Sequence, residues 1–190
     1  LHPYKQAWFH QINKRMTQKF TLFSQEIEDF VLELKIDEEA TFLQLHQLIL
    51  EACGYKDTQN HSFLICDEDW RVKEHIRQNE SGSYNSEEDI YLMRNTSLRE
   101  FLEEEGQRLA YIFDPEGKRF FLMELTENIF GKPQDIPMVS RRHGKAPLQS
   151  LYLEQETEKT ETTTDLDEEF YGDNGFDESE IDQEGFEINE

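Results

Sequence analysis

The sequence predicts an α+β domain that is followed by a disordered tail. Apolar and polar residues alternate between positions 20 and 36, as in half-buried strands, whereas between 42 and 53 the apolar residues recur every three or four positions, as on one face of a helix. Acidic residues are concentrated at the C-terminus. We therefore expect a mixed or antiparallel sheet of about five strands, covered by one long and one short helix.

The first predicted strands form an antiparallel pair. Phe20 and Leu22 alternate with polar neighbours, and after a turn near residues 25–28 a clearer alternation places four apolar side chains on one face, namely Phe30, Leu32, Leu34 and Ile36. Strands with this pattern bury one face and leave the other in water. We expect a helix to cover the buried face.

The long helix is expected to begin at Thr41 and to end at Gly54. Thr41 and Gln44 have the spacing of a capping box, in which each side chain satisfies a backbone N–H group of the other residue. A glycine directly after the last apolar position favours a left-handed helix end. The predicted apolar face consists of Phe42, Leu45, Leu48, Ile49, Ala52 and Cys53.

Short strands are expected at residues 62–66 and 90–93. The intervening residues 67–86 mix charges with glycine and serine, which favours a long loop. Within this loop we expect Trp70 and Val72 to pack inward.

A hairpin is the clearest prediction in the second half of the domain. Ser97 and Glu100 repeat the capping-box spacing and predict the short helix. Strands are then expected at residues 107–114 and 118–126, joined by an Asp-Pro-Glu-Gly turn. Both strands are apolar on both faces, which predicts that they are central in the sheet. Residues 127–150 contain three prolines and are expected to be irregular.

Three segments follow from these patterns: a basic N-terminal extension at residues 1–15, the α+β domain at 16–150 and the tail at 151–190. The N-terminal extension contains no acidic residue and places Tyr4, Trp8 and Ile12 on one helical face. That pattern is typical of a basic amphipathic anchor. A methionine directly before the first strand favours instead an extension outside the domain.

The tail at 151–190 combines charge with aromatic side chains. It contains 16 acidic residues and one lysine, so it carries −15 of the formal net charge of −23. Such a segment is too acidic to fold alone, and we expect it to be disordered. Its aromatic anchors, Phe170, Tyr171, Phe176 and Phe186, suit a linear motif that orders on a protein partner. A purely solubilising tail is the alternative.

No apolar run reaches the ~20 residues that cross a bilayer, and no secretory signal is recognisable. We therefore expect a soluble, cytoplasmic protein without a membrane segment. Cys53 and Cys66 lack metal-ligand spacing, and we expect them to be buried free thiols.

Two groups of residues could carry chemistry or binding. Metal-capable or ligand-contacting side chains occur at His46, His61, Cys66, Asp67, Asp69 and Trp70, although a zinc site usually shows paired ligands and these histidines could be structural. A basic patch of Arg141, Arg142 and Lys145 could contact nucleic acid, or be neutralised by the acidic tail. No catalytic residue and no cofactor is assigned.

Part of the chain resembles a known family. Residues 45–63 contain a Leu-His pair, a Gly-Tyr pair and a His-Ser-Phe triplet in unbroken register, and residues 111–114 read Tyr-Ile-Phe-Asp. Over roughly residues 17–150 the chain is similar to the plasmid pRiA4b open-reading-frame-three family. The resemblance implies an α+β fold, frequent occurrence beside mobile elements and no established activity. The chain departs from the family pattern at Val31-Leu32-Glu33, where members often carry Trp-Arg-Arg, and at residues 144–147.

The leading functional hypothesis is a non-enzymatic binding or adaptor module with an acidic-aromatic interaction tail. One alternative is a metal-dependent hydrolase or nucleotide-processing enzyme built around His61, Asp67 and Asp69. Another is a weak nucleic-acid binder that acts through the basic patch and is regulated by the tail.

Overall fold

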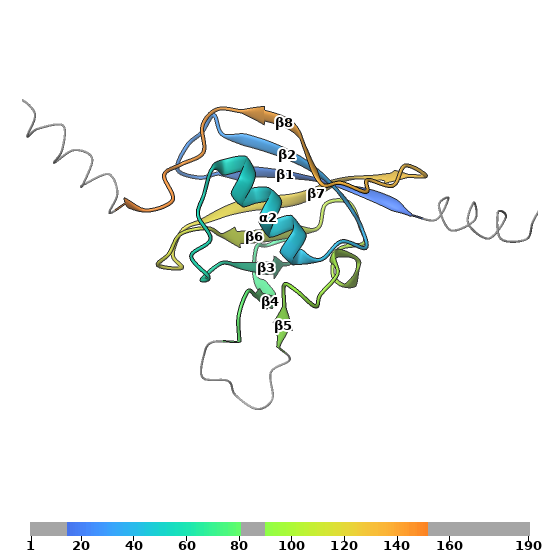
Figure 1. Cartoon of the computed structure of the whole chain (residues 1–190), viewed down its shortest axis with the longest axis horizontal. Helices are drawn as coiled ribbons and strands as arrows, with labels where there is room; N and C mark the ends of the chain where they lie inside the picture. Colours follow the sequence, from blue (N-terminus) through green and yellow to red (C-terminus); the bar gives the residue numbers. More distant parts are fainter. Residues whose placement is uncertain (1–14, 81–89, 152–190) are drawn as a thin grey trace, which may run out of the picture. The chain divides into compact units, whose positions relative to one another are not determined.

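The computed structural model describes residues 15–80 and 90–151. These residues form one eight-stranded sheet with the α-helix α2 across one of its faces (Figure 1). The elements are β1 (Met16–Ser24), β2 (Val31–Asp37), α2 (Phe42–Cys53), β3 (Ser62–Cys66), β4 (Val72–Arg77), β5 (Tyr91–Leu92), the 3-10 helix η1 (Leu98–Glu100), β6 (Arg108–Ile112), β7 (Phe120–Phe130) and β8 (Met138–His143).

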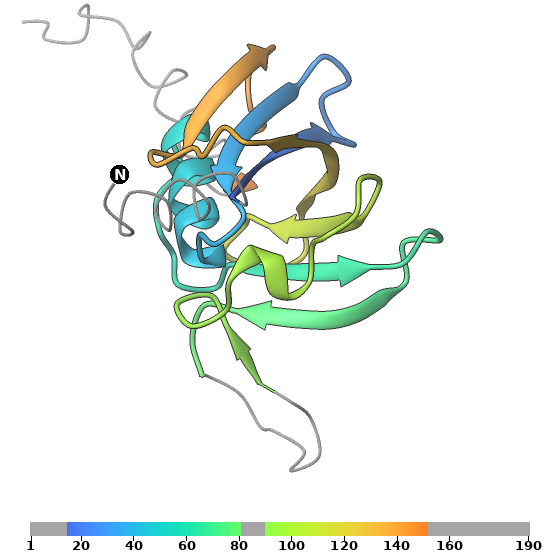
Figure 2. The same ribbon diagram turned by 90° about the vertical axis from the view of Figure 1, so that its right-hand side faces the viewer.

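The strand order is β5-β4-β3-β6-β7-β1-β2-β8. Only β4 and β5 run parallel, and every other neighbouring pair is antiparallel. Figure 2 shows β8 along one edge of the sheet and β5 beside β4 at the other. The predicted hairpin is confirmed, and its strands β6 and β7 occupy the two central positions, as their apolar faces indicated.

The predicted strand pair and long helix are also confirmed. β1 and β2 pair antiparallel, and the four alternating side chains of the second strand are at most 2% exposed. At the start of α2 the Gln44 backbone N–H donates to Thr41 Oγ1 at 3.3 Å, and the Thr41 N–H donates to Gln44 Oε1 at 2.9 Å. Gly54 ends the helix with a φ of 70°, in the left-handed region.

The hydrophobic core lies between α2 and the sheet. Apolar side chains of α2 pack against alternate residues of the strands, and large aromatic rings fill the centre. The Phe42 ring of α2 lies 5.3 Å from the Phe63 ring of β3, and the Phe113 ring lies 4.5 Å from the Phe121 ring of β7. Phe101, just after η1, also contacts Phe42, so η1 and α2 lie on the same side of the sheet.

The predicted fold class is wrong. Instead of about five strands with a long and a short helix, the described residues contain eight strands and one α-helix. Two strands were missed because they carry no apolar alternation: in β4 only Ile76 is buried, and β8 has no buried residue. The predicted loop at 67–86 therefore contains β4, and the predicted irregular region at 127–150 contains β8.

The short helix is reduced to a single 3-10 turn. The Leu98 and Arg99 backbone N–H groups donate to the carbonyls of Ala40 at 2.8 Å and Glu38 at 3.0 Å. The predicted cap is present, since the Glu100 carboxylate accepts from the Ser97 backbone N–H at 2.7 Å. Leu98 is fully buried, so tertiary packing ties this segment to the β2–α2 connection rather than extending it as a helix.

The face of the sheet opposite α2 is called the open face below. Directly paired residues share a face. Phe63, Tyr111 and Phe121 pair in register on the α2 side, and their neighbours Leu64, Ala110 and Leu122 pair in register on the open face. No described helix covers the open face, and no described helix is long and apolar enough to cross a membrane.

Candidate functional site

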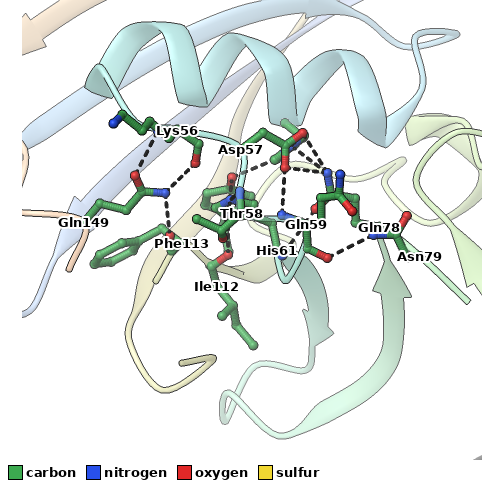
Figure 3. A network of polar contacts seen from close by, with 12 residues as sticks. Lys56, Asp57, Thr58, Gln59, His61, Gln78, Asn79, Ile112, Phe113 and Gln149 are labelled. Carbon is green, nitrogen blue, oxygen red and sulfur yellow. Dashed lines mark hydrogen bonds and ion pairs between the residues drawn. The ribbon is translucent and has the colours of Figure 1, made fainter. Parts of the chain in front are cut away.

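A network of polar side chains lies under α2 (Figure 3). His46 comes from the buried face of α2, His61 precedes β3, and Tyr111 comes from β6. The Tyr111 hydroxyl lies 2.8 Å from His46 Nδ1 and 3.3 Å from His61 Nδ1. The three residues are at most 2% exposed, so helix, sheet and loop share one buried polar cluster.

The hydrogen-bond partners favour one tautomer for each histidine. The Thr58 backbone N–H donates to His61 Nε2 at 3.2 Å, so in the neutral ring the hydrogen lies on Nδ1. This Nδ1 faces the Ile112 carbonyl and the Tyr111 hydroxyl, both at 3.3 Å. The tyrosine hydrogen is then available to donate to His46 Nδ1, which leaves the His46 hydrogen on Nε2.

Asp57 forms the solvent-facing end of the network. Its Oδ2 lies 3.6 Å from His46 Nε2. The Gln78 amide donates to both carboxylate oxygens, at 2.8 and 2.9 Å, and the Gln59 backbone N–H donates to Oδ1 at 2.9 Å. The order Tyr111, His46, Asp57 thus runs from the core to a half-exposed carboxylate.

Burial controls the electrostatics of the network. Desolvation, together with the nearby His61, lowers the pKa of His46 to about 4. Desolvation also lowers the pKa of His61 and raises that of the Tyr111 hydroxyl well above its usual value. For Asp57, burial acts to raise the pKa, but the hydrogen bonds from Gln78 and Gln59 outweigh it, and the pKa is lowered.

This arrangement keeps the His46 and His61 rings neutral near pH 7. Each of their four nitrogens has a polar partner or neighbour. Because His46 and Tyr111 are fully buried, their polar atoms tie α2 to β6 rather than face a substrate. Sequence reasoning selected His46 and His61 but missed Tyr111, Asp57 and Gln78. His46 lies on the apolar face of a predicted helix, and Tyr111 lies in a strand that is predicted to be buried on both faces. Buried polar groups need hydrogen-bond partners, so the sequence already indicated that these two side chains could bind each other.

A small polar hollow of about 250 Å³ lies next to the network. Gln59, on its rim, has a φ of 63°, and its carbonyl accepts from the Asn79 side chain at 3.0 Å. The hollow is lined by Gln59, Asn60, His61, Ser62, His75, Arg77, Gln78 and Asn79.

A larger, apolar hollow of about 370 Å³ lies on the open face. It is called the open-face hollow below. Its floor comes from β3, β6 and β7, and Trp70 and Val72 line it from the β3–β4 connection and β4. Val72, which was expected to pack inward, is 53% exposed. The lining residues are Gln25, Leu64, Cys66, Trp70, Val72, Ala110, Phe120 and Leu122.

The turn that carries Trp70 is closely defined. Trp70 has a φ of 62°, which for a bulky residue costs roughly 1–2 kcal/mol. Asp67 Oδ1 accepts from the backbone N–H groups of Asp69 at 3.0 Å and Arg71 at 2.9 Å. The Arg108 guanidinium lies 5.2 Å from the Trp70 ring centroid and donates to the Glu68 carbonyl. Strain held in this way is a common sign of a binding or catalytic position.

The residues proposed for a metal site are not brought together. His61 precedes the five-residue strand β3 and Asp67 follows it, which separates them by roughly 15–20 Å at ~3.3 Å per residue. Among the described residues no group of three or more His, Cys, Asp or Glu side chains could hold a metal ion. Asp67 and Asp69 belong to the Trp70 turn, and Cys66 lines the open-face hollow as a free thiol.

The basic patch lies at the β8 edge. Arg141 and Arg142 belong to β8, and Lys145 follows two residues after its end. Arg141 forms a 3.6 Å ion pair with Glu33 of β2. The tail anchors Phe170, Tyr171, Phe176 and Phe186 lie outside the described residues.

Comparison with known proteins supports the resemblance drawn from the sequence. The sequence model of plasmid pRiA4b ORF-3-like proteins matches residues 25–184. A crystal structure of a protein of unknown function, MM3350 from Methanosarcina mazei Go1, has a similar fold, with a TM-score of 0.54 at 13% identity over 80% of this chain and 84% of that chain. A search of curated proteins returned no match.

Proposed function

The chain belongs to the plasmid pRiA4b ORF-3-like family, and we propose that it is a non-enzymatic binding module that receives an apolar side chain of a protein partner in the open-face hollow. The observation that carries this proposal is an apolar hollow on a sheet face that no described helix covers, lined by a tryptophan in a strained backbone conformation.

The chemistry of the hollow favours an apolar group. Seven of its eight lining residues, all but Gln25, present carbon- or sulfur-rich side chains. Its volume of about 370 Å³ is near the lower end of the ~300–1,000 Å³ range of ligand sites. Burying one large apolar side chain there would contribute roughly 1.5–3 kcal/mol. An anchor of this kind is common at the centre of protein interfaces.

The surroundings favour a protein over a free apolar molecule. Arg108, which contacts Trp70, lies directly opposite Glu124 in the register of β6 and β7. Lys73 forms a 3.2 Å ion pair with Asp67, close to Trp70 in the chain. A polar rim around an apolar centre is the usual anatomy of a protein interface. The acidic-aromatic tail would supply a second contact, to basic surface on the same partner.

Peptide-library selection on the immobilised full chain tests the hollow. We expect the enriched peptides to share one aromatic or large aliphatic residue, and to lose binding to a Leu64→Asp, Leu122→Lys variant. Ile136→Asp is the matched control, because Ile136 is 76% exposed and does not line the hollow. Peptides that bind the hollow variant as well as the original protein would contradict the proposal.

The contribution of the tail is tested separately. Partners identified in this way are measured against the full chain and against a chain that lacks residues 154–190, with circular dichroism to check that both are folded. We expect weaker binding and a smaller salt dependence without the tail. Unchanged affinity would remove the tail from the proposal and leave the hollow in place.

A further inference from the structure

We propose that the exposed edge of β8 binds an acidic, extended segment of a partner protein as an additional strand of the sheet. The surface consists of β8 and Lys145, with the positive or titratable side chains Arg141, Arg142, His143 and Lys145, and is called the basic edge below. It is separate from the open-face hollow and does not depend on it.

The basic edge is long and unpaired among the described residues. β8 stands last in the strand order, and it pairs with β2 on one side only. In an antiparallel pair, alternate residues direct their N–H and C=O groups away from the partner strand. Alternate residues of the six-residue strand β8 therefore offer backbone donors and acceptors to an incoming chain, along the sheet edge beyond β2 (Figure 1). The opposite edge strand, β5, has two residues.

Charge extends to both faces of this edge. Arg141 pairs with Glu33, which lies on the open-face side, whereas Arg142 pairs with Leu32, whose side chain is in the core under α2. The exposed side chains of Arg141 and Arg142 therefore flank the strand from both faces. The edge is positively charged although the whole chain has a net charge of −23. Because salt screens charges beyond about 8 Å, a ligand at this edge responds to the nearby arginines rather than to the net charge.

Arginine and lysine on an edge strand also discourage edge-to-edge aggregation. The positive charges repel a basic strand and give a neutral strand no electrostatic attraction, but they attract a strand that carries carboxylates. A strand with acidic residues at successive positions would place carboxylates near Arg141 on one face and near Arg142 on the other. Charge complementarity therefore defines the partner that this edge accepts.

The edge is held in place before any partner binds. The Ser140 hydroxyl donates to the Glu33 carbonyl at 3.2 Å, next to a register shift between Glu33 and Leu34. Gly144, directly after β8, has a φ of 70° and lies so close to Asp29 that a Cβ atom would stand 2.6 Å from the Asp29 carbonyl oxygen. A strand fixed at its middle and at its end loses little freedom on binding.

A peptide strand fits this surface better than nucleic acid. Phosphates would engage the cations and the backbone N–H groups, but they would leave the outward carbonyls of β8 without donors, whereas an added strand satisfies both kinds of group. Double-stranded DNA carries one charge per ~1.7 Å and would extend past this short patch. A strand of about six residues would cover β8 alone.

Fluorescence anisotropy with the full chain tests this proposal. The probe is a labelled seven-residue peptide in which pairs of adjacent glutamates alternate with valine or threonine, so that its carboxylates lie on both faces of the strand. Its control is the same peptide with every backbone nitrogen methylated, which keeps the charge and removes the N–H donors from both edges of the strand. We expect the probe to bind and the methylated peptide to bind at least tenfold more weakly. An Arg141→Gln, Arg142→Gln variant should also lose about tenfold in affinity, since two exposed charge pairs contribute roughly 1.4 kcal/mol together.

The matched control variant is Arg94→Gln, Arg99→Gln, which removes the same charge from exposed sites outside β8. It should bind the probe as the original protein does. No binding of the probe, equal binding of the methylated peptide, or equal loss in the control variant would each overturn the proposal. Tighter binding of an oligothymidylate than of the probe, lost in the β8 variant, would overturn it in favour of a phosphate site.

Discussion

The Tyr111 hydroxyl lies 2.8 Å from His46 Nδ1 at the centre of the domain, where β6 meets α2. This contact joins a helix and a strand 65 residues apart in sequence. It also places a neutral histidine in the core, because desolvation lowers the pKa of His46 to about 4. Stability of the domain should therefore depend on both the hydroxyl group and the pH.

Tyr111→Phe should destabilise the domain by roughly 1–3 kcal/mol. The substitution keeps the ring and its packing but removes the partner of His46 Nδ1, and a buried polar atom without a partner is costly. Denaturant unfolding measures the change. In a double-mutant cycle with His46→Leu, the second substitution should add less than it costs alone. Strict additivity would mean that the two side chains do not act as a pair.

The domain should lose stability as the pH falls from about 6.5 to about 4. Over this range His46 takes up a proton in the unfolded chain but not in the folded one, so the unfolded state binds more protons and the free energy of unfolding decreases. One such histidine contributes about 1.4 kcal/mol per pH unit at most. Urea unfolding at several pH values measures the slope.

His46→Gln should make that slope shallower, because an amide can still accept from Tyr111 but does not titrate. A His143→Gln variant is the control, because it makes the same substitution on the exposed edge strand β8. An unchanged slope in His46→Gln would assign the pH dependence to other groups, of which His61 is the first candidate.

Gly144→Ala should destabilise the domain much more than Gly117→Ala. Both glycines have a φ near 70°, so alanine costs roughly 1–2 kcal/mol of backbone strain at either position. At Gly144 the new Cβ would also meet the Asp29 carbonyl oxygen at 2.6 Å and its carbon at 2.9 Å, whereas at Gly117 nothing lies within 4 Å. Thermal unfolding compares the two. Equal losses of stability would show that the backbone around Gly144 and Asp29 can move apart to accept a Cβ atom without further loss of stability.

Trp70→Gly should be at least as stable as Trp70→Ala. Both variants lose the contact with Arg108, but glycine adopts the φ of 62° without strain, whereas alanine does not. We expect a difference of about 1 kcal/mol in favour of glycine. In an ordinary strand or helix the order is reversed. A more stable alanine variant would mean that the turn relaxes once the indole ring is removed.

Local patterns were sufficient for the elements that bury apolar side chains. Thr41 and Gln44 predicted the start of α2, Gly54 predicted its end, and the Asp-Pro-Glu-Gly turn predicted the β6–β7 hairpin, because caps and turns depend on residues close in sequence. β4 and β8 could not be found in this way. Their side chains are largely polar, and they are strands only because β3 and β2 offer them hydrogen bonds.

The sequence by itself determined the helix caps, the central hairpin, the family and the separation of an acidic C-terminal segment from a mildly charged domain, because each of these depends on short-range pattern or composition. Only the tertiary structure decided that the sheet has eight strands, that His46, Tyr111 and Asp57 meet, that His61 and Asp67 do not, and that Arg141 and Arg142 lie on an exposed edge. Those relationships depend on strand order and register, which join residues far apart in the chain and leave no trace in the spacing of the residues themselves.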